Sequence, residues 1–163
     1  MTVTHVGVLG GGLIGMSWAS LFLARGLKVT VVEPREGAEA EVSAFVAAAW
    51  PHLRALGLTQ AEAPGQAVVY SDINALADVD FVQENGPDRI AIKQDIVAAL
   101  EAVIGTDVVI ASSTSSLMAS DIQAKAVHPE RILVAHPMNP PLPHSPFQFL
   151  QALDQAHEKR CRS

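Results

Sequence analysis

The sequence predicts a doubly wound α/β fold, in which helices cover both faces of a mostly parallel sheet of about six strands. Short runs rich in valine and isoleucine alternate with longer helical stretches along the 163 residues. The runs are continuously apolar, which is typical of parallel strands buried on both faces. This architecture places ligands at the carboxyl ends of the strands, so polar residues there are candidates for function.

Six segments are expected to form the strands. They are residues 5–10, 27–33, 67–70, 79–84, 107–112 and 131–136, with the sequences HVGVLG, LKVTVVE, AVVY, VDFVQE, DVVIAS and RILVAH. The helices expected between them span residues 13–26, 35–57, 88–105 and 117–126. Pro51 is expected to kink or split the second helix, because proline lacks the N–H group that a helix interior uses.

The alternation of strands and helices ends after Pro140, where three more prolines precede a polar end. We therefore expect residues 1–141 to form one domain. Residues 142–163 are expected to be a divergent or disrupted tail, extended and with at most one frayed helix.

Composition and charge are those of a globular, cytoplasmic protein. Hydrophobic residues make up 49% of the chain and charged residues 17%. The net charge of −6, without a cluster of Lys or Arg, argues against nucleic acid or an anionic membrane as partner. The single Cys161 and the spacing of the histidines predict no disulfide and no metal site. No secretory signal is expected, and the longest mostly apolar segment is too short to span a bilayer.

A glycine motif lies between the first expected strand and the first expected helix. Residues 6–18, VGVLGGGLIGMSW, contain Gly10-x-Gly12-x-x-Gly15. Glycines permit the tight turn, the approach of a pyrophosphate and close packing of helix on strand, and the helix start attracts phosphate. The predicted dinucleotide-binding turn comprises Gly10, Gly11, Gly12, Leu13, Ile14 and Gly15. The alternative is a turn with a purely structural role.

Glu33 ends the second expected strand, eighteen residues after Gly15. An acid at this place accepts hydrogen bonds from the adenosine ribose and repels a 2′-phosphate, which favours NAD over NADP. Arg35 lies two residues further on and is able to meet such a phosphate, so the preference stays open at this point.

Two polar features follow the later strands. Five consecutive hydroxyl residues, Ser112 to Ser116, are suited either to bind a carbonyl or alcohol or to cap the next helix. His136 ends the last expected strand, where it is suited to take a proton from an alcohol as hydride leaves the same carbon. The alternative for His136 is a histidine packed beside prolines.

Four segments together resemble the NAD-binding Rossmann domain of the 3-hydroxyacyl-CoA dehydrogenases. They are GVLGGGLIG, ENGPDRIAIKQDI, ASSTSSL and PERILVAHPMNPP, and the resemblance covers residues 3–141. The form HPxNPP is similar to the branch related to lambda-crystallin, with L-gulonate 3-dehydrogenase and carnitine dehydrogenase among its relatives. The resemblance implies hydride transfer between NAD and a small-molecule substrate, a 3-hydroxyacyl-CoA or 3-hydroxy acid.

The resemblance also assigns roles to single residues. Those that would contact the cofactor are Gly10, Gly12, Gly15, Glu33, Asp88, Lys93 and Ser115. His136 would be the catalytic histidine, Ser115 would contact the reacting oxygen, and Asn139 would shape the pocket.

The chain departs from the family at two positions in this region. Ser113 stands where the family usually has asparagine, which removes one polar contact near the nicotinamide. Gln148 stands where the family has a glutamate, twelve residues after its histidine. A carboxylate would stabilise the imidazolium and a neutral amide does not, so we expect weak or absent turnover.

The 163 residues hold no counterpart of the family's helical C-terminal domain, which supplies an asparagine, closes the cleft and forms the dimer. One explanation is a short protein with a divergent end, and the other is a changed reading frame near Leu142. The alternatives to an active dehydrogenase are a non-catalytic NAD-binding module and a fragment that depends on a partner. The chain would then form a homodimer or associate with a chain that supplies the missing domain.

Overall fold

Six parallel strands form a single sheet in the computed structural model, which describes residues 2–137. The strands are β1 (His5–Leu9), β2 (Lys28–Val32), β3 (Val68–Tyr70), β4 (Phe81–Glu84), β5 (Val109–Ser112) and β6 (Ile132–Val134). Their order across the sheet is β3-β2-β1-β4-β5-β6, and every pairing is parallel. The predicted doubly wound α/β fold is therefore confirmed, with each strand inside the segment expected for it.

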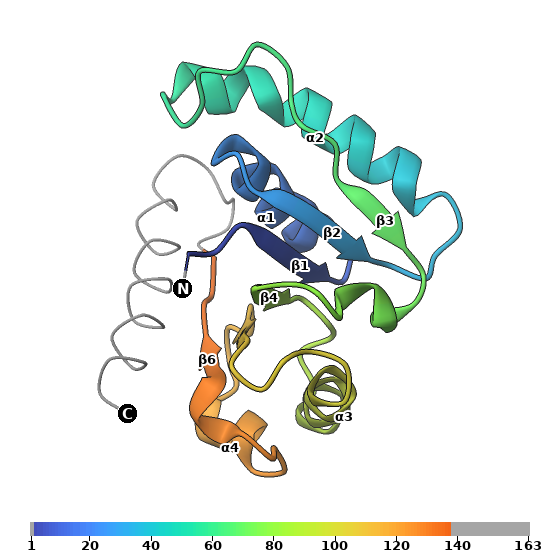
Figure 1. The fold of residues 1–163 in the computed structure, drawn as a ribbon, viewed down its shortest axis with the longest axis vertical. Coiled ribbons are helices and arrows are strands. Elements are labelled where there is room, and N and C mark those ends of the chain that lie inside the picture. Colours follow the sequence, from blue (N-terminus) through green and yellow to red (C-terminus); the bar gives the residue numbers. More distant parts are fainter. Residues whose placement is uncertain (1, 138–163) are drawn as a thin grey trace.

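Helices cover both faces of this sheet. They are α1 (Leu13–Ala24), α2 (Ala38–Ala55), α3 (Ile90–Glu101) and α4 (Ala119–Gln123), with 3₁₀ turns η1 (Ile73–Leu76) and η2 (Pro129–Arg131). The first two helices lie on one face, and α3 and α4 lie on the other (Figure 1). No helix within residues 2–137 is long and apolar enough to cross a membrane.

Two apolar cores result, one on each face, because successive strand residues point to opposite sides. On the α1 face, Val6 and Val8 pack in one cluster with Trp18 and Phe22. On the α3 face, Val82, Ile110 and Leu100 belong to the second cluster. The four inner strands β1, β2, β4 and β5 are thus buried on both sides, which explains why their sequences are apolar without alternation, whereas the edge strands β3 and β6 keep exposed residues.

The second helix is continuous through Pro51, so the expected split is wrong. Pro51 lies inside α2, which runs unbroken from Ala38 to Ala55. Its neighbours Trp50 and Leu53 are buried against the α1 face of the sheet. The Trp50 indole also donates a hydrogen bond to the Ala61 carbonyl, at 3.0 Å. Burial of these side chains holds the helix together across the position where proline supplies no N–H group.

Replacing Pro51 is expected to stabilise the protein. The side chain is exposed, so Pro51→Ala restores a helical hydrogen bond without opening a cavity. Proline in a helix interior costs about 3 kcal/mol relative to alanine. Alanine gives the unfolded chain more conformational entropy than proline does, which offsets roughly 0.4–1 kcal/mol of this gain in stability. Urea unfolding should therefore show an increase of about 2 kcal/mol. An unchanged or lower free energy of unfolding would contradict this account, and Ala48→Gly should move stability the other way.

Candidate functional site

A cleft of about 920 Å³ opens at the carboxyl edge of the sheet. Its lining comes from the turn between β1 and α1, the end of β2, the segments that follow β3 and β4, and one residue of α3. The strand order reverses at β1, because β2 and β4 pair on its two sides. Ligands of open parallel sheets bind at such a switch point.

The glycine turn forms the floor of this cleft. Gly10 has a φ of +94°, a conformation that favours glycine. A Cβ on Gly15 would overlap the carbonyl oxygen of Gly10, so α1 approaches the turn more closely than any other residue allows. Gly12, by contrast, has nothing within 4 Å of the place where a Cβ would stand. It directly precedes α1, whose first turn has no side-chain cap, so an anion is able to meet free N–H groups.

Glu33 directly follows β2 and lies beside the glycine turn. One carboxylate oxygen accepts a hydrogen bond from the Gly11 amide at 2.9 Å, and the other accepts from the Arg35 amide at 3.2 Å. Its own amide donates to the Tyr70 carbonyl of β3. Both Glu33 and Asp72 line the cleft. The structure therefore places two acids at the end of the cleft formed by β2 and β3.

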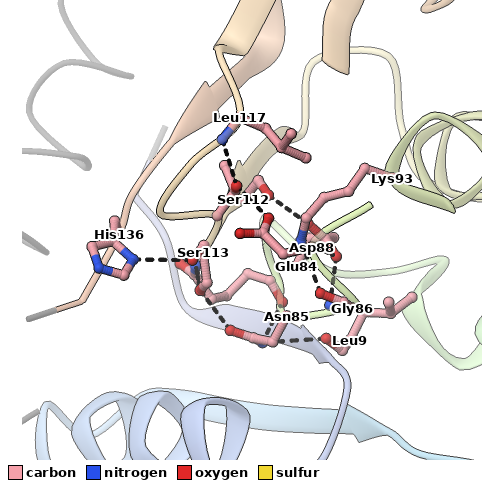
Figure 2. A network of polar contacts seen from close by, with 12 residues as sticks. Leu9, Glu84, Asn85, Gly86, Asp88, Lys93, Ser112, Ser113, Leu117 and His136 are labelled. Atoms are coloured by element: carbon pink, nitrogen blue, oxygen red, sulfur yellow. Dashed lines mark hydrogen bonds and ion pairs between the residues drawn. The ribbon is translucent and has the colours of Figure 1, made fainter. Parts of the chain in front are cut away.

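Lys93 points into the protein interior. Its ammonium lies 2.8 and 3.1 Å from the two Glu84 carboxylate oxygens and donates to the Gly86 carbonyl at 2.9 Å (Figure 2). Ser112 donates a further hydrogen bond to Glu84, at 2.6 Å. Both charged residues are 1% exposed. All three ammonium protons thus have partners. Lys93 contacts the loop after β4 through the Gly86 carbonyl and does not line the cleft.

Asp88 ties that loop to the hydroxyl residues after β5. It accepts hydrogen bonds from the hydroxyls of Thr114 and Ser116, and Ser115 lies at the 3.5 Å limit. Partial burial alone would raise the pKa of Asp88, but these hydrogen bonds and the charge of Lys93 outweigh it and lower the pKa. The carboxylate is therefore charged at neutral pH, and Ser115 keeps the weakest of the three contacts.

The alternative reading of the hydroxyl residues, as caps of the next helix, is not what the structure shows. Met118 occupies the cap position of α4 and provides no side-chain hydrogen bond. Thr114 instead accepts from the amides of Ser116 and Leu117, which closes a turn before the helix. The hydroxyl groups instead form hydrogen bonds to Glu84 at the end of β4 and to Asp88 in the loop that follows it.

Ser113 is the centre of a polar network that the sequence did not reveal. Its hydroxyl accepts from the Trp18 indole at 3.1 Å and the Gln83 amide at 2.7 Å, and donates to Asn85 at 2.7 Å. Asn85 in turn donates to the carbonyls of Leu9 and Gln83. One donor and two acceptor sites exhaust a hydroxyl. A glutamine inside the otherwise largely apolar strand segment VDFVQE is the signal that could have indicated buried polar contacts here.

His136 stands next to this network (Figure 2). It is exposed, and its Nδ1 lies 3.1 Å from the Ser113 carbonyl oxygen. A carbonyl only accepts, so this contact requires the proton on Nδ1 and leaves the Nε2 lone pair available. Asn139 and Gln148 lie outside the described residues. Within residues 2–137 no three acids, histidines or cysteines are grouped as metal ligands.

Alanine substitutions at two glycines of the turn are expected to affect different properties, stability for Gly15 and NADH binding for Gly12. Gly15→Ala drives a methyl group into the Gly10 carbonyl, so we expect unfolding to become easier by about 1–3 kcal/mol or more. Gly12→Ala meets open space and should leave stability unchanged, while its methyl group obstructs a pyrophosphate and weakens NADH binding by about tenfold or more. Thermal unfolding and NADH fluorescence titration of both variants separate the two effects. Equal stability of the two variants would refute the assignment.

The buried ion pair between Lys93 and Glu84 is expected to contribute to the free energy of unfolding. Lys93→Met leaves Glu84 charged and buried without a cation, which costs about 3–5 kcal/mol. Adding Glu84→Gln should recover much of the loss, because the uncompensated charge disappears. Lys125→Met, on an exposed residue, serves as the control. Urea unfolding measures all three, and a Lys93→Met variant as stable as the control would show that the pair is unimportant.

Comparison with known proteins identifies the family to which the chain belongs. The chain matches the family described as 3-hydroxyacyl-CoA dehydrogenase, NAD binding domain, over residues 5–144. L-carnitine dehydrogenase of Streptomyces coelicolor is 42% identical over 140 residues, which cover 85% of this chain and 44% of that protein. The enzyme of the same name from Pseudomonas aeruginosa is 47% identical over 137 residues, covering 81% and 41%. This chain thus spans less than half the length of these curated relatives.

The fold agrees with a solved structure as well. The crystal structure of 3-hydroxybutyryl-CoA dehydrogenase from Escherichia coli K12 matches with a TM-score of 0.79 and 22% sequence identity. The match covers 98% of this chain and 37% of that one. Strand order, glycine turn and sequence similarity agree, and the chain belongs to the 3-hydroxyacyl-CoA dehydrogenase family through the NAD-binding domain of that family.

Proposed function

We propose that this domain binds NAD in the cleft and transfers hydride between NAD and a 3-hydroxyacyl-CoA or 3-hydroxy acid. The observation that carries the proposal is the meeting of two features at one sheet edge. The glycine turn and Glu33 line the cleft, and His136 follows β6 at the same carboxyl edge, beyond β4 and β5, with Nδ1 on the Ser113 carbonyl. An imidazole oriented through Nδ1 at the same sheet edge as a dinucleotide site suits a dehydrogenase.

In this proposal the glycine turn and the start of α1 hold the pyrophosphate, and Glu33 accepts hydrogen bonds from the adenosine ribose. Asp88 and Ser115 would contact the nicotinamide half of the cofactor, while Lys93 would act through Glu84 on the loop that carries Asp88. Bound NAD supplies the hydride acceptor at nicotinamide C4.

The proton of the substrate hydroxyl goes to His136 Nε2, and the Ser115 hydroxyl holds the substrate oxygen. Ser115 is exposed and has the longest of the hydroxyl contacts to Asp88, so its hydroxyl is able to turn toward a substrate. Asn139 is proposed to shape the pocket. Residues 1–141 are proposed as the domain, with residues 142–163 as a tail. A homodimer or a second chain would close the cleft.

A 3-hydroxy acid is the first substrate class to test, because L-carnitine dehydrogenases are among the similar proteins and L-carnitine is a 3-hydroxy acid. Gln148 favours a second candidate function, a non-catalytic NAD-binding module, since an amide does not stabilise the imidazolium.

One experiment separates these functions. NADH fluorescence titration measures cofactor binding, and absorbance at the nicotinamide band follows oxidation of L-carnitine and of 3-hydroxybutyryl-CoA. We expect NADH binding and a slow turnover that His136→Ala lowers by about 100-fold or more and Gln148→Glu raises. His52→Ala, an exposed histidine on α2, is the control. NADH binding without turnover by the unchanged chain selects the binding module, and absence of NADH binding overturns both.

A further inference from the structure

The guanidinium of Arg35 lies between two carboxylates at the end of the cleft. Its Nε is 3.4 Å from a Glu33 oxygen, while Nη1 and Nη2 donate to the two oxygens of Glu41 at 3.3 and 3.0 Å. The contact with Glu41 is bidentate, the geometry in which arginine binds a carboxylate or phosphate most specifically. All three nitrogens of Arg35 are therefore engaged by acids.

The charges around the cleft give this arrangement a consequence. Glu33 and Asp72 line the cleft, and no lysine or arginine does so in the described part of the chain. Arg35 touches the cleft through Glu33 and is the cation able to offset that acid. A 2′-phosphate on the adenosine ribose would stand near Glu33 and would need a free guanidinium, but the Arg35 fork already holds the carboxylate of Glu41.

We propose that Glu41, from the first turn of α2, is a specificity-determining residue that keeps Arg35 from a 2′-phosphate and so excludes NADP. Glu33 repels the phosphate directly, and Glu41 occupies the cation that would otherwise compensate. This inference rests on the proposed binding of NAD in the cleft. It gives a role to a surface ion pair eight residues beyond the acid that follows β2.

The same helix provides a matched control. Glu39 also lies in the first turn of α2 and is exposed, like Glu41. In residues 2–137, the ion pairs of Arg35 are with Glu33 and Glu41 and none is with Glu39. Replacing either glutamate removes one negative charge from the start of the helix, but only Glu41→Gln releases the arginine. A selective effect at position 41 thus excludes a general effect of net charge.

The test uses NADH and NADPH fluorescence titrations on the 163-residue chain. Glu33→Ser should lower the ratio of the NADPH and NADH dissociation constants. Adding Glu41→Gln should lower it by a further two- to fivefold or so, the size expected for one exposed ion pair. We call this further decrease in the ratio the gain. Adding Glu39→Gln instead should leave the ratio unchanged, and Arg35→Ala in the Glu33→Ser/Glu41→Gln background should abolish the gain. The gain should also shrink as salt is added, because exposed charges are screened.

Each outcome decides between the possibilities. A gain confined to Glu41→Gln and dependent on Arg35 supports the inference. The inference is overturned by no gain with Glu41→Gln, by an equal gain with Glu39→Gln, or by a gain that survives Arg35→Ala. In each of these cases NADH binding still upholds the proposed binding of NAD in the cleft. If the unchanged chain binds neither nucleotide, the proposed function fails and this inference fails with it. Circular dichroism of each variant confirms that a lost signal is not unfolding.

Discussion

The buried ion pair between Glu84 and Lys93 is the interaction on which the functional edge of the sheet depends. Two charges with 1% exposure are tolerable only where every donor and acceptor is satisfied. Here Ser112 and the Gly86 amide complete the shell of Glu84, and the Gly86 carbonyl completes that of Lys93. The pair therefore fixes the end of β5 and the loop after β4 together.

A series of contacts connects this pair to His136. The loop after β4 carries Asp88, which holds the hydroxyl residues after β5, and Asn85, which binds the Ser113 hydroxyl. The Ser113 carbonyl then meets His136 at the end of β6. A buried charge pair thus determines the position of an exposed imidazole through three neighbouring strands. Gly86 adds a steric constraint, because a side chain there would strike Ile96 and Glu84.

Much of the architecture could be predicted from the sequence because it is encoded locally. Continuous valine and isoleucine runs define buried parallel strands, and the spacing of Gly10, Gly12 and Gly15 defines the turn beside Glu33. Side-chain direction was not accessible in this way. The motif position of Lys93 suggested a cofactor contact, but the buried Glu84, nine residues earlier, draws its ammonium inward. The continuity of α2 through Pro51 likewise depends on packing by Trp50, which no local pattern reports.

The Ser113 network also bears on how the protein is assembled during synthesis. Its hydrogen bonds join residues far apart in the chain, with 95 positions between Trp18 and Ser113 and 28 between Asn85 and Ser113. Contacts of this kind require long loops to close, and the entropy of closure must be offset by the packing of both halves. The acceptor for the Trp18 indole does not exist until the ribosome has reached Ser113. No shorter nascent chain contains the Ser113 carbonyl that His136 contacts, so the first βαβ unit is made long before this edge of the sheet is complete.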